Sequence, residues 1–285
     1  MKYLYFMLFL IMSAVTISYG QEAKKDELKI GWNKQLVGTL NFSQASFDNW
    51  TAGGENSWST LFNLTGSFIN KQEKWNWRNF YKVEYGQSQI GDAEARKTTD
   101  EIFVESEYAR NMSKVISVFG AVNGRTQFTP GYDFSVDPKI EISKFFNPAY
   151  FRESVGLKYT PSDIFNTRGG LGLKQTVVSD TSFAFYTDDM DTDDLEKLRN
   201  EVGVESVSNL NYKIKKNILF TSNLDIFSNL KNVNQIDVRW DNLISAEVMK
   251  YVSVSFNLQL YYDRDLSLKR QLKQYLAVGL TYSLL

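Results

Sequence analysis

Residues 57–70, SWSTLFNLTGSFIN, alternate between large apolar and small polar side chains along most of their length. In an extended chain Trp58, Phe62 and Phe68 share one face, while Ser59 and Asn63 share the other. This period of two predicts a β-strand with one apolar face. Strands of soluble domains usually have about five or six residues. A tilted strand that crosses a bilayer needs about nine to eleven, so this stretch favours a membrane barrel.

The same alternation recurs along the chain, for example at residues 252–262, VSVSFNLQLYY. We predict an all-β fold, an antiparallel up-and-down transmembrane β-barrel of about 12 strands. The strands are expected at residues 36–47, 57–70, 75–87, 100–111, 114–127, 149–160, 167–178, 199–213, 217–228, 235–248, 251–263 and 271–284.

The predicted links between strands alternate in length, as in outer-membrane barrels with short periplasmic turns and longer loops on the other rim. Short links are expected at 71–74, 112–113, 161–166, 214–216 and 249–250, and longer ones at 48–56, 88–99, 128–148, 179–198, 229–234 and 264–270. An even strand number puts both termini in the periplasm.

The alternative is a soluble all-β protein, whose strands also alternate. The polar face disfavours it, because it carries charged residues that suit a wet or salt-bridged lumen. We expect a salt-bridge lattice inside the barrel rather than an acid–base pair of carboxylates. The predicted lumen charges are Arg78, Lys82, Glu84, Glu105, Glu107, Asp237, Arg239 and Asp241.

The N-terminus resembles a secretory signal peptide, with Lys2 before an apolar run and small residues near Gly20. A membrane-anchoring helix is the alternative, but the run is short for a full span. We therefore predict a signal peptide at residues 1–20, cleaved near Gly20, an N-terminal periplasmic segment at 21–35 and an outer-membrane β-barrel at 36–285.

Composition narrows the function. The 285 residues include no Cys and no His, which removes disulfides, thiolate metal sites and the usual general base. Loss of Lys2 from the 32 basic residues leaves 31 against 33 acidic ones, which gives no reason to expect nucleic acid as a partner. We expect no enzyme activity and no cofactor.

One motif is unusual, the stretch NWTAGGENSW at residues 49–58. It resembles the Trp-x-x-Gly-Gly-Glu-Asn-Ser signature of an uncharacterised family of Bacteroidota outer-membrane β-barrels, a domain of unknown function. The resemblance implies an outer-membrane barrel and brings no catalytic residues. We favour a structural turn over a ligand or partner contact on the rim. The matching residues are Trp50, Gly53, Gly54, Glu55, Asn56 and Ser57.

An acidic loop, residues 188–196, contains Asp189, Asp191, Asp193 and Glu196. The alternating Asp residues resemble the start of a calcium loop, but Asp194 stands where such a loop needs Gly. A solvated loop is the favoured interpretation, and weak calcium binding is the alternative.

These patterns predict a non-enzymatic outer-membrane barrel, either a narrow porin-like pore for small solutes or a structural envelope component. The alternative is an accessory subunit of a larger outer-membrane assembly or transport complex. The expected partners are outer-membrane lipid and a protein of the envelope.

Overall fold

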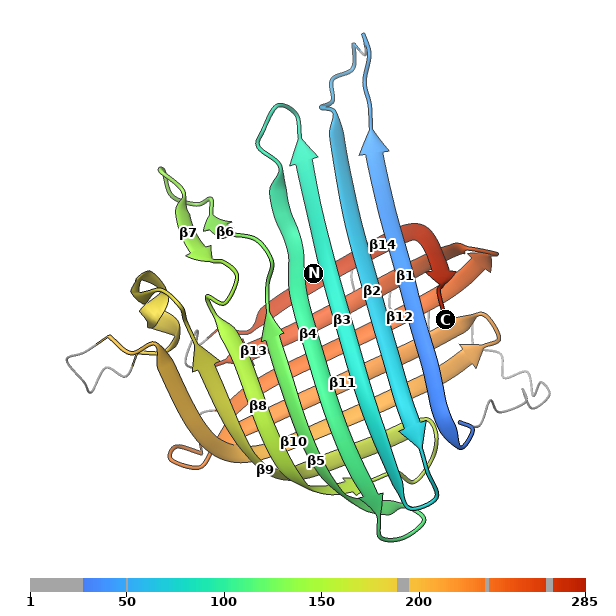
Figure 1. The fold of residues 1–285 in the computed structure, drawn as a ribbon. Coiled ribbons are helices and arrows are strands. Elements are labelled where there is room, and N and C mark those ends of the chain that lie inside the picture. Colours follow the sequence, from blue (N-terminus) through green and yellow to red (C-terminus); the bar gives the residue numbers. More distant parts are fainter. Residues whose placement is uncertain (1–27, 50, 189–194, 234–235, 265–268) are drawn as a thin grey trace.

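The computed structural model describes residues 28–49, 51–188, 195–233, 236–264 and 269–285, and its main element is a closed antiparallel barrel (Figure 1). The strands follow one another around the wall in chain order, and β1 and β14 close it. This confirms the predicted up-and-down barrel of twelve strands. In the part of the chain that the structure describes, no helix is long and apolar enough to cross a membrane.

The predicted strands are all present, with shifted ends. The barrel consists of β1 (Gly31–Ala45), β2 (Ser57–Lys71), β3 (Trp75–Ile90), β4 (Arg96–Asn111), β5 (Ile116–Thr126), β8 (Ala149–Tyr159), β9 (Phe165–Val177), β10 (Leu198–Lys215), β11 (Ile218–Asn229), β12 (Ile236–Met249), β13 (Val252–Asp263) and β14 (Gln271–Ser283).

Strand β1 starts at Gly31, inside the segment that we assigned to a periplasmic tail. Its first residues continue the ladder with β2, from Gly31 opposite Lys71 onward. The exposed Lys34 interrupts the apolar alternation there, which is why the pattern alone starts the strand at residue 36. The predicted signal peptide lies outside the described residues.

The long links contain structure that the alternation did not predict. Between β5 and β8 the chain forms a small hairpin, β6 (Gly131–Asp133) and β7 (Ile140–Ser143), and after β9 it forms the 3₁₀ helix η1 (Thr181–Tyr186) (Figure 1). The predicted alternation of link lengths holds, except that the β3–β4 link is only residues 91–95. Strands β3 and β4 both extend into residues 88–99, which the alternation predicted to be a longer loop.

The barrel closes through a short seam. The register between β1 and β14 runs only from Val37 opposite Ser283 to Asn41 opposite Gly279. Above it, β1 continues to Ala45, beyond the stretch that pairs with β14. The seam lies towards the short-turn rim, where β1 begins and β14 ends. We call this the lower rim, and the rim with the long loops the upper rim.

The two faces of the wall differ sharply. Apolar side chains such as Leu157, Leu171, Leu276 and Leu280 point outward and are exposed. Buried apolar side chains inside the barrel are few, with Phe119 and Phe227 the largest. This arrangement is inside out relative to a soluble domain, because most of the apolar surface faces away from the interior.

Candidate functional site in the barrel lumen

Inward-facing charged residues from opposite walls meet inside the barrel. Arg239 on β12 donates to Glu101 on β4 at 2.7 Å, across 138 residues of sequence. Arg168 on β9 likewise reaches Glu105 and Glu107 on β4, although these strands are not neighbours in the wall. Contacts between distant strands are possible only through the lumen, so the polar face lines the interior.

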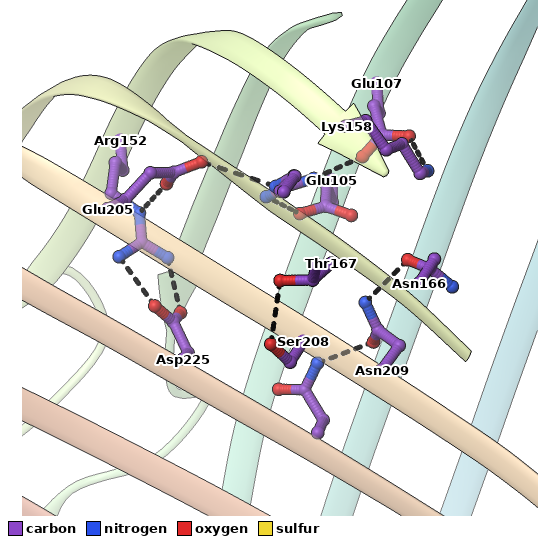
Figure 2. Close-up of polar contacts among 12 residues, drawn as sticks. Glu105, Glu107, Arg152, Lys158, Asn166, Thr167, Glu205, Ser208, Asn209 and Asp225 are labelled. Atoms are coloured by element: carbon purple, nitrogen blue, oxygen red, sulfur yellow. Dashed lines mark hydrogen bonds and ion pairs between the residues drawn. The ribbon is translucent and has the colours of Figure 1, made fainter. Parts of the chain in front are cut away.

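The largest group of ion pairs fills one side of the lumen. Arg168 lies 2.7 Å from Glu105, 2.5 Å from Glu107 and 3.3 Å from Glu205. Figure 2 shows Lys158 beside Glu107, and Arg152 between Glu205 and Asp225. We call this group the arginine cluster: Arg78, Glu105, Glu107, Arg152, Lys158, Arg168, Glu205 and Asp225. It has four cations and four carboxylates, so its charges balance.

A second group of ion pairs and hydrogen bonds lies on the side of β2, β3, β12 and β13. Lys82 on β3 lies 3.1 Å from Glu84 and 3.6 Å from Asp241 on β12. Amide groups complete the hydrogen bonds of these carboxylates: Asn63 donates to Glu84 at 2.7 Å, and Asn257 and Gln259 donate to Asp241 at 2.7 and 2.9 Å. We call these six residues the waist layer.

The waist layer separates two cavities. The upper cavity, about 550 Å³, includes Glu101, Arg239, Gln259 and Lys273 in its lining. The lower cavity, about 670 Å³, includes Asn63, Leu243, Ser255 and Tyr275. The two linings have no residue in common. Along β12 the inner face passes from Leu243 through Asp241 to Arg239, so the barrier is about one side chain thick.

The structure places all the predicted lumen charges in ion pairs or hydrogen bonds of the interior. Arg78 and Glu105 pair directly, and Asp237 lies 2.5 Å from Lys174. Other charged residues of the interior were not predicted from the sequence. Continuing the alternation by two residues from Glu105 reaches Phe103 and then Glu101, so the signal was present for Glu101. The other charged residues that were not predicted include Arg125, Arg152, Lys158, Arg168, Lys174, Glu201, Glu205, Asp225 and Lys273.

The Gly-rich motif forms the link between β1 and β2. Gly53 and Gly54 have φ of 86° and 141°, and a Cβ at Gly54 would lie 2.7 Å from the Phe47 ring. Asn56 accepts a hydrogen bond from Phe47 N at 2.7 Å through its side chain, and another from Gly91 N through its carbonyl oxygen. These contacts give the loop a structural role and tie it to the β3–β4 link. Trp50 lies outside the described residues.

Loops at the upper rim are fastened to one another above the upper cavity. The buried Asn147 accepts hydrogen bonds from Ser179 N and Asp180 N, at 2.9 and 3.0 Å. Asp180 also caps η1 by accepting from Ser182 N at 3.0 Å, and Lys144 lies 3.1 Å from its other oxygen. The backbone hydrogen bond from Ser182, followed by that from Lys144, lowers the pKa of Asp180 to about 2.

The proposed calcium loop is only partly described. Asp189, Asp191 and Asp193 lie outside the described residues. The backbone N–H of Glu196 points to Asp188 Oδ1 at 3.4 Å. Elsewhere in the described chain no group of three or more acidic residues could hold a metal ion. Weak calcium binding therefore stays a prediction.

Comparisons with solved structures found other β-barrels. The chain is similar to the NanC porin, with a TM-score of 0.41 and 9% identity over 86% of this chain and 98% of that one. An outer membrane channel from Pseudomonas putida F1 has a TM-score of 0.41 and 9% identity, over 92% of this chain and 99% of that one. The translocator domain of autotransporter NalP from Neisseria meningitidis has a TM-score of 0.36 and 10% sequence identity, over 90% of each chain. Likeness at this level does not assign a function.

Comparison with curated proteins found no match. Two family models match parts of the chain, and each covers less than half of it. Residues 42–132 match "Protein of unknown function (DUF3078)", and residues 155–284 match "Protein of unknown function, DUF481". Both descriptions agree with the predicted uncharacterised family, whereas the Bacteroidota origin and the Trp-x-x-Gly-Gly-Glu-Asn-Ser signature stay predictions.

Proposed function

We propose that this chain is a non-enzymatic outer-membrane barrel that provides a narrow pathway for small solutes, closed at rest by the waist layer. The observation that carries the proposal is the pair of cavities on the two sides of one layer of side chains. A purely structural barrel has no need of deep, polar cavities at both rims.

The membrane location follows from the outer surface. Leu276 and Leu280 are 70% and 61% exposed on β14, and Leu157 is 60% exposed on β8. A soluble monomer rarely exposes a continuous apolar band of this kind, because its contact with water costs free energy. Trp77, Tyr81 and Tyr108 add exposed aromatic rings, which favour the interface between lipid and water.

In this proposal the pathway opens by a side-chain rearrangement in the waist layer. Lys82 contacts three carboxylates, Glu84, Glu101 and Asp241, and can exchange between them without an unpaired intermediate. The arginine cluster stays in place on the opposite side of the lumen. The passage would therefore be narrow and lined by charged and amide groups.

Planar-bilayer recording tests this proposal with two double variants. Lys82→Ala/Asp241→Ala removes one cation and one anion from the waist layer, and we expect larger and more frequent conductance steps than in the unmodified barrel. Lys139→Ala/Glu94→Ala removes an exposed loop ion pair as a matched control and should conduct like the unmodified barrel. A difference in gel migration between boiled and unboiled samples shows that each protein is folded.

The result that would contradict the proposal is the absence of conductance steps. If the folded waist-layer variant and the unmodified protein both give no steps, the lumen is closed by more than the waist layer. A structural envelope role would then replace the pathway.

A further inference from the structure

The described lining of the upper cavity contains three cations and three carboxylates, but its two arginines share a single carboxylate. Arg125 and Arg239 both pair with Glu101, at 2.8 and 2.7 Å, and Lys82 shares the same carboxylate at 3.4 Å. Among the described residues, Glu101 is the only carboxylate within 4.0 Å of either guanidinium. Each guanidinium has five N–H donors, so most of these donors have no anionic acceptor.

Lys273 is the third cation of this lining. Its ammonium group donates to Thr99 Oγ1 at 2.6 Å. Glu84 and Glu101 line the same cavity, but among the described residues Lys273 has no ion pair shorter than 4.0 Å. The other carboxylates of the cavity are already engaged. Glu84 pairs with Lys82 in the waist layer, and Asp100 accepts from the backbone N–H groups of Phe128 and Thr129 at 2.7 and 2.8 Å.

The arginine cluster supplies more carboxylates per arginine than the upper cavity does. There Arg168 alone contacts three carboxylates, and Arg152 contacts two. Cations that are partly removed from water without enough counter-charge are costly unless an anion supplies it. The upper cavity has room for such an anion, whereas the arginines of the arginine cluster already contact two or three carboxylates each.

We propose that the floor of the upper cavity binds a small organic anion, whose carboxylate or phosphate oxygens take the donors of Arg125, Arg239 and Lys273. Arginine suits such oxygens because its planar fork donates two parallel hydrogen bonds. Tyr150 and Tyr261 line the same cavity and offer aromatic surface to the body of the solute. A volume of about 550 Å³ accommodates a molecule of this size.

The lower cavity has an excess of positive charge in its described lining. Among the described residues, its lining includes Lys213, Lys215, Lys216 and Lys250 but only one acidic residue, Glu247. Long-range attraction there would favour anions over cations along the whole passage. The transport role of the anion site rests on the proposed pathway, but binding to the site does not require the barrel to conduct.

Calorimetric titration of the folded full chain in detergent and low salt tests the site. The probes are benzoate, inorganic phosphate and benzyl alcohol, which separate carboxylate, phosphate and neutral aromatic ligands. We expect benzoate or phosphate to bind and benzyl alcohol not to bind. Lys273→Gln should weaken the anion about tenfold, because one charged hydrogen-bond donor is lost. Lys114→Gln, in the exposed β4–β5 turn, is the matched control and should change nothing.

Three results would overturn the site: no binding of either anion, binding of benzyl alcohol as strong as that of benzoate, or equal affinities in the Lys273→Gln and unmodified proteins. Conductance separates the two proposals. If the waist-layer variant conducts but no anion binds, the pathway stands and the site is wrong. If the anion binds and neither protein conducts, the site stands and the pathway is wrong.

Discussion

Arg168 is only 3% exposed and holds three carboxylates, Glu105, Glu107 and Glu205, in one cluster. Removing one partner from a buried ion pair costs about 3–5 kcal/mol, because the remaining charges lose their compensation. We expect Arg168→Met to destabilise the barrel by that amount and Arg168→Lys by less, since lysine keeps the charge but loses the fork. Loss of the fast-migrating folded band with temperature measures the effect.

The matched control is Lys139→Met, which removes an exposed partner of Glu94 and should cost about 0–1 kcal/mol. If Arg168→Met were no more harmful than this control, water would already screen the arginine cluster. The cluster would then contribute little to stability.

Asp180 gives a pH prediction outside the membrane-spanning strands. Its pKa of about 2 lies below the ordinary value of 3.8 because Ser182 N–H and Lys144 stabilise the carboxylate. A lowered carboxyl pKa stabilises the folded loops fully above about pH 4, and this contribution disappears as the pH falls through 2. We expect the carboxyl ¹³C shift of Asp180 to titrate near pH 2, and at a higher pH in Ser182→Pro, which lacks the backbone donor but keeps Lys144. A midpoint near 4 in the unmodified protein would show that the cap does not form.

At the scale of strands, alternation was sufficient to place every barrel strand, because a wall residue faces either lipid or lumen and the two surfaces demand different side chains. The alternation did not predict structure in the loops, whose residues face neither lipid nor lumen. The strands β6 and β7 have only 3 and 4 residues, too few for a period to be recognised, and η1 has 6.

Alternation also predicted which residues point into the lumen, but not their partners. Glu105 and Arg168 meet because the barrel closes with a particular stagger, which brings β4 and β9 together across the interior. Stagger is a property of all the strand registers together, so no single strand encodes it. The waist layer and the two cavities were for this reason not predictable from the sequence.

The short seam between β1 and β14 is where we expect the wall to be most sensitive. A Cβ at Gly279 would lie 2.2 Å from Asn41 Oδ1 and 2.6 Å from the Leu40 carbonyl oxygen, so Gly279→Val must push the two strands apart. A Cβ at Gly120, on β5, would meet nothing within 4 Å, which makes Gly120→Val the matched control. We expect the folded band of Gly279→Val to disappear at lower temperature than that of the control. Equal temperatures would mean that the seam is not the weak point of the wall.

At the scale of the whole molecule, the question is whether the outer wall of the barrel contacts lipid or water. One pair of substitutions distinguishes the two. Leu171, at the centre of β9, and Ile140, on the β6–β7 hairpin, are each 57% exposed. In water, arginine at either position would be nearly neutral, because both side chains already contact solvent. In a bilayer, arginine near the midplane of the lipid-facing wall costs about 2–4 kcal/mol, whereas a loop above the rim is unaffected.

We therefore expect Leu171→Arg to refold poorly into lipid vesicles while Ile140→Arg refolds like the unmodified chain, as measured by the yield of heat-modifiable protein. Both variants should fold equally in detergent micelles, which adapt to the added charge more easily than a bilayer does. Equal yields in vesicles would place the centre of β9 outside the lipid and contradict the membrane location. A loss confined to Leu171→Arg in vesicles would show that the apolar outer wall is solvated by lipid, as its inside-out arrangement requires.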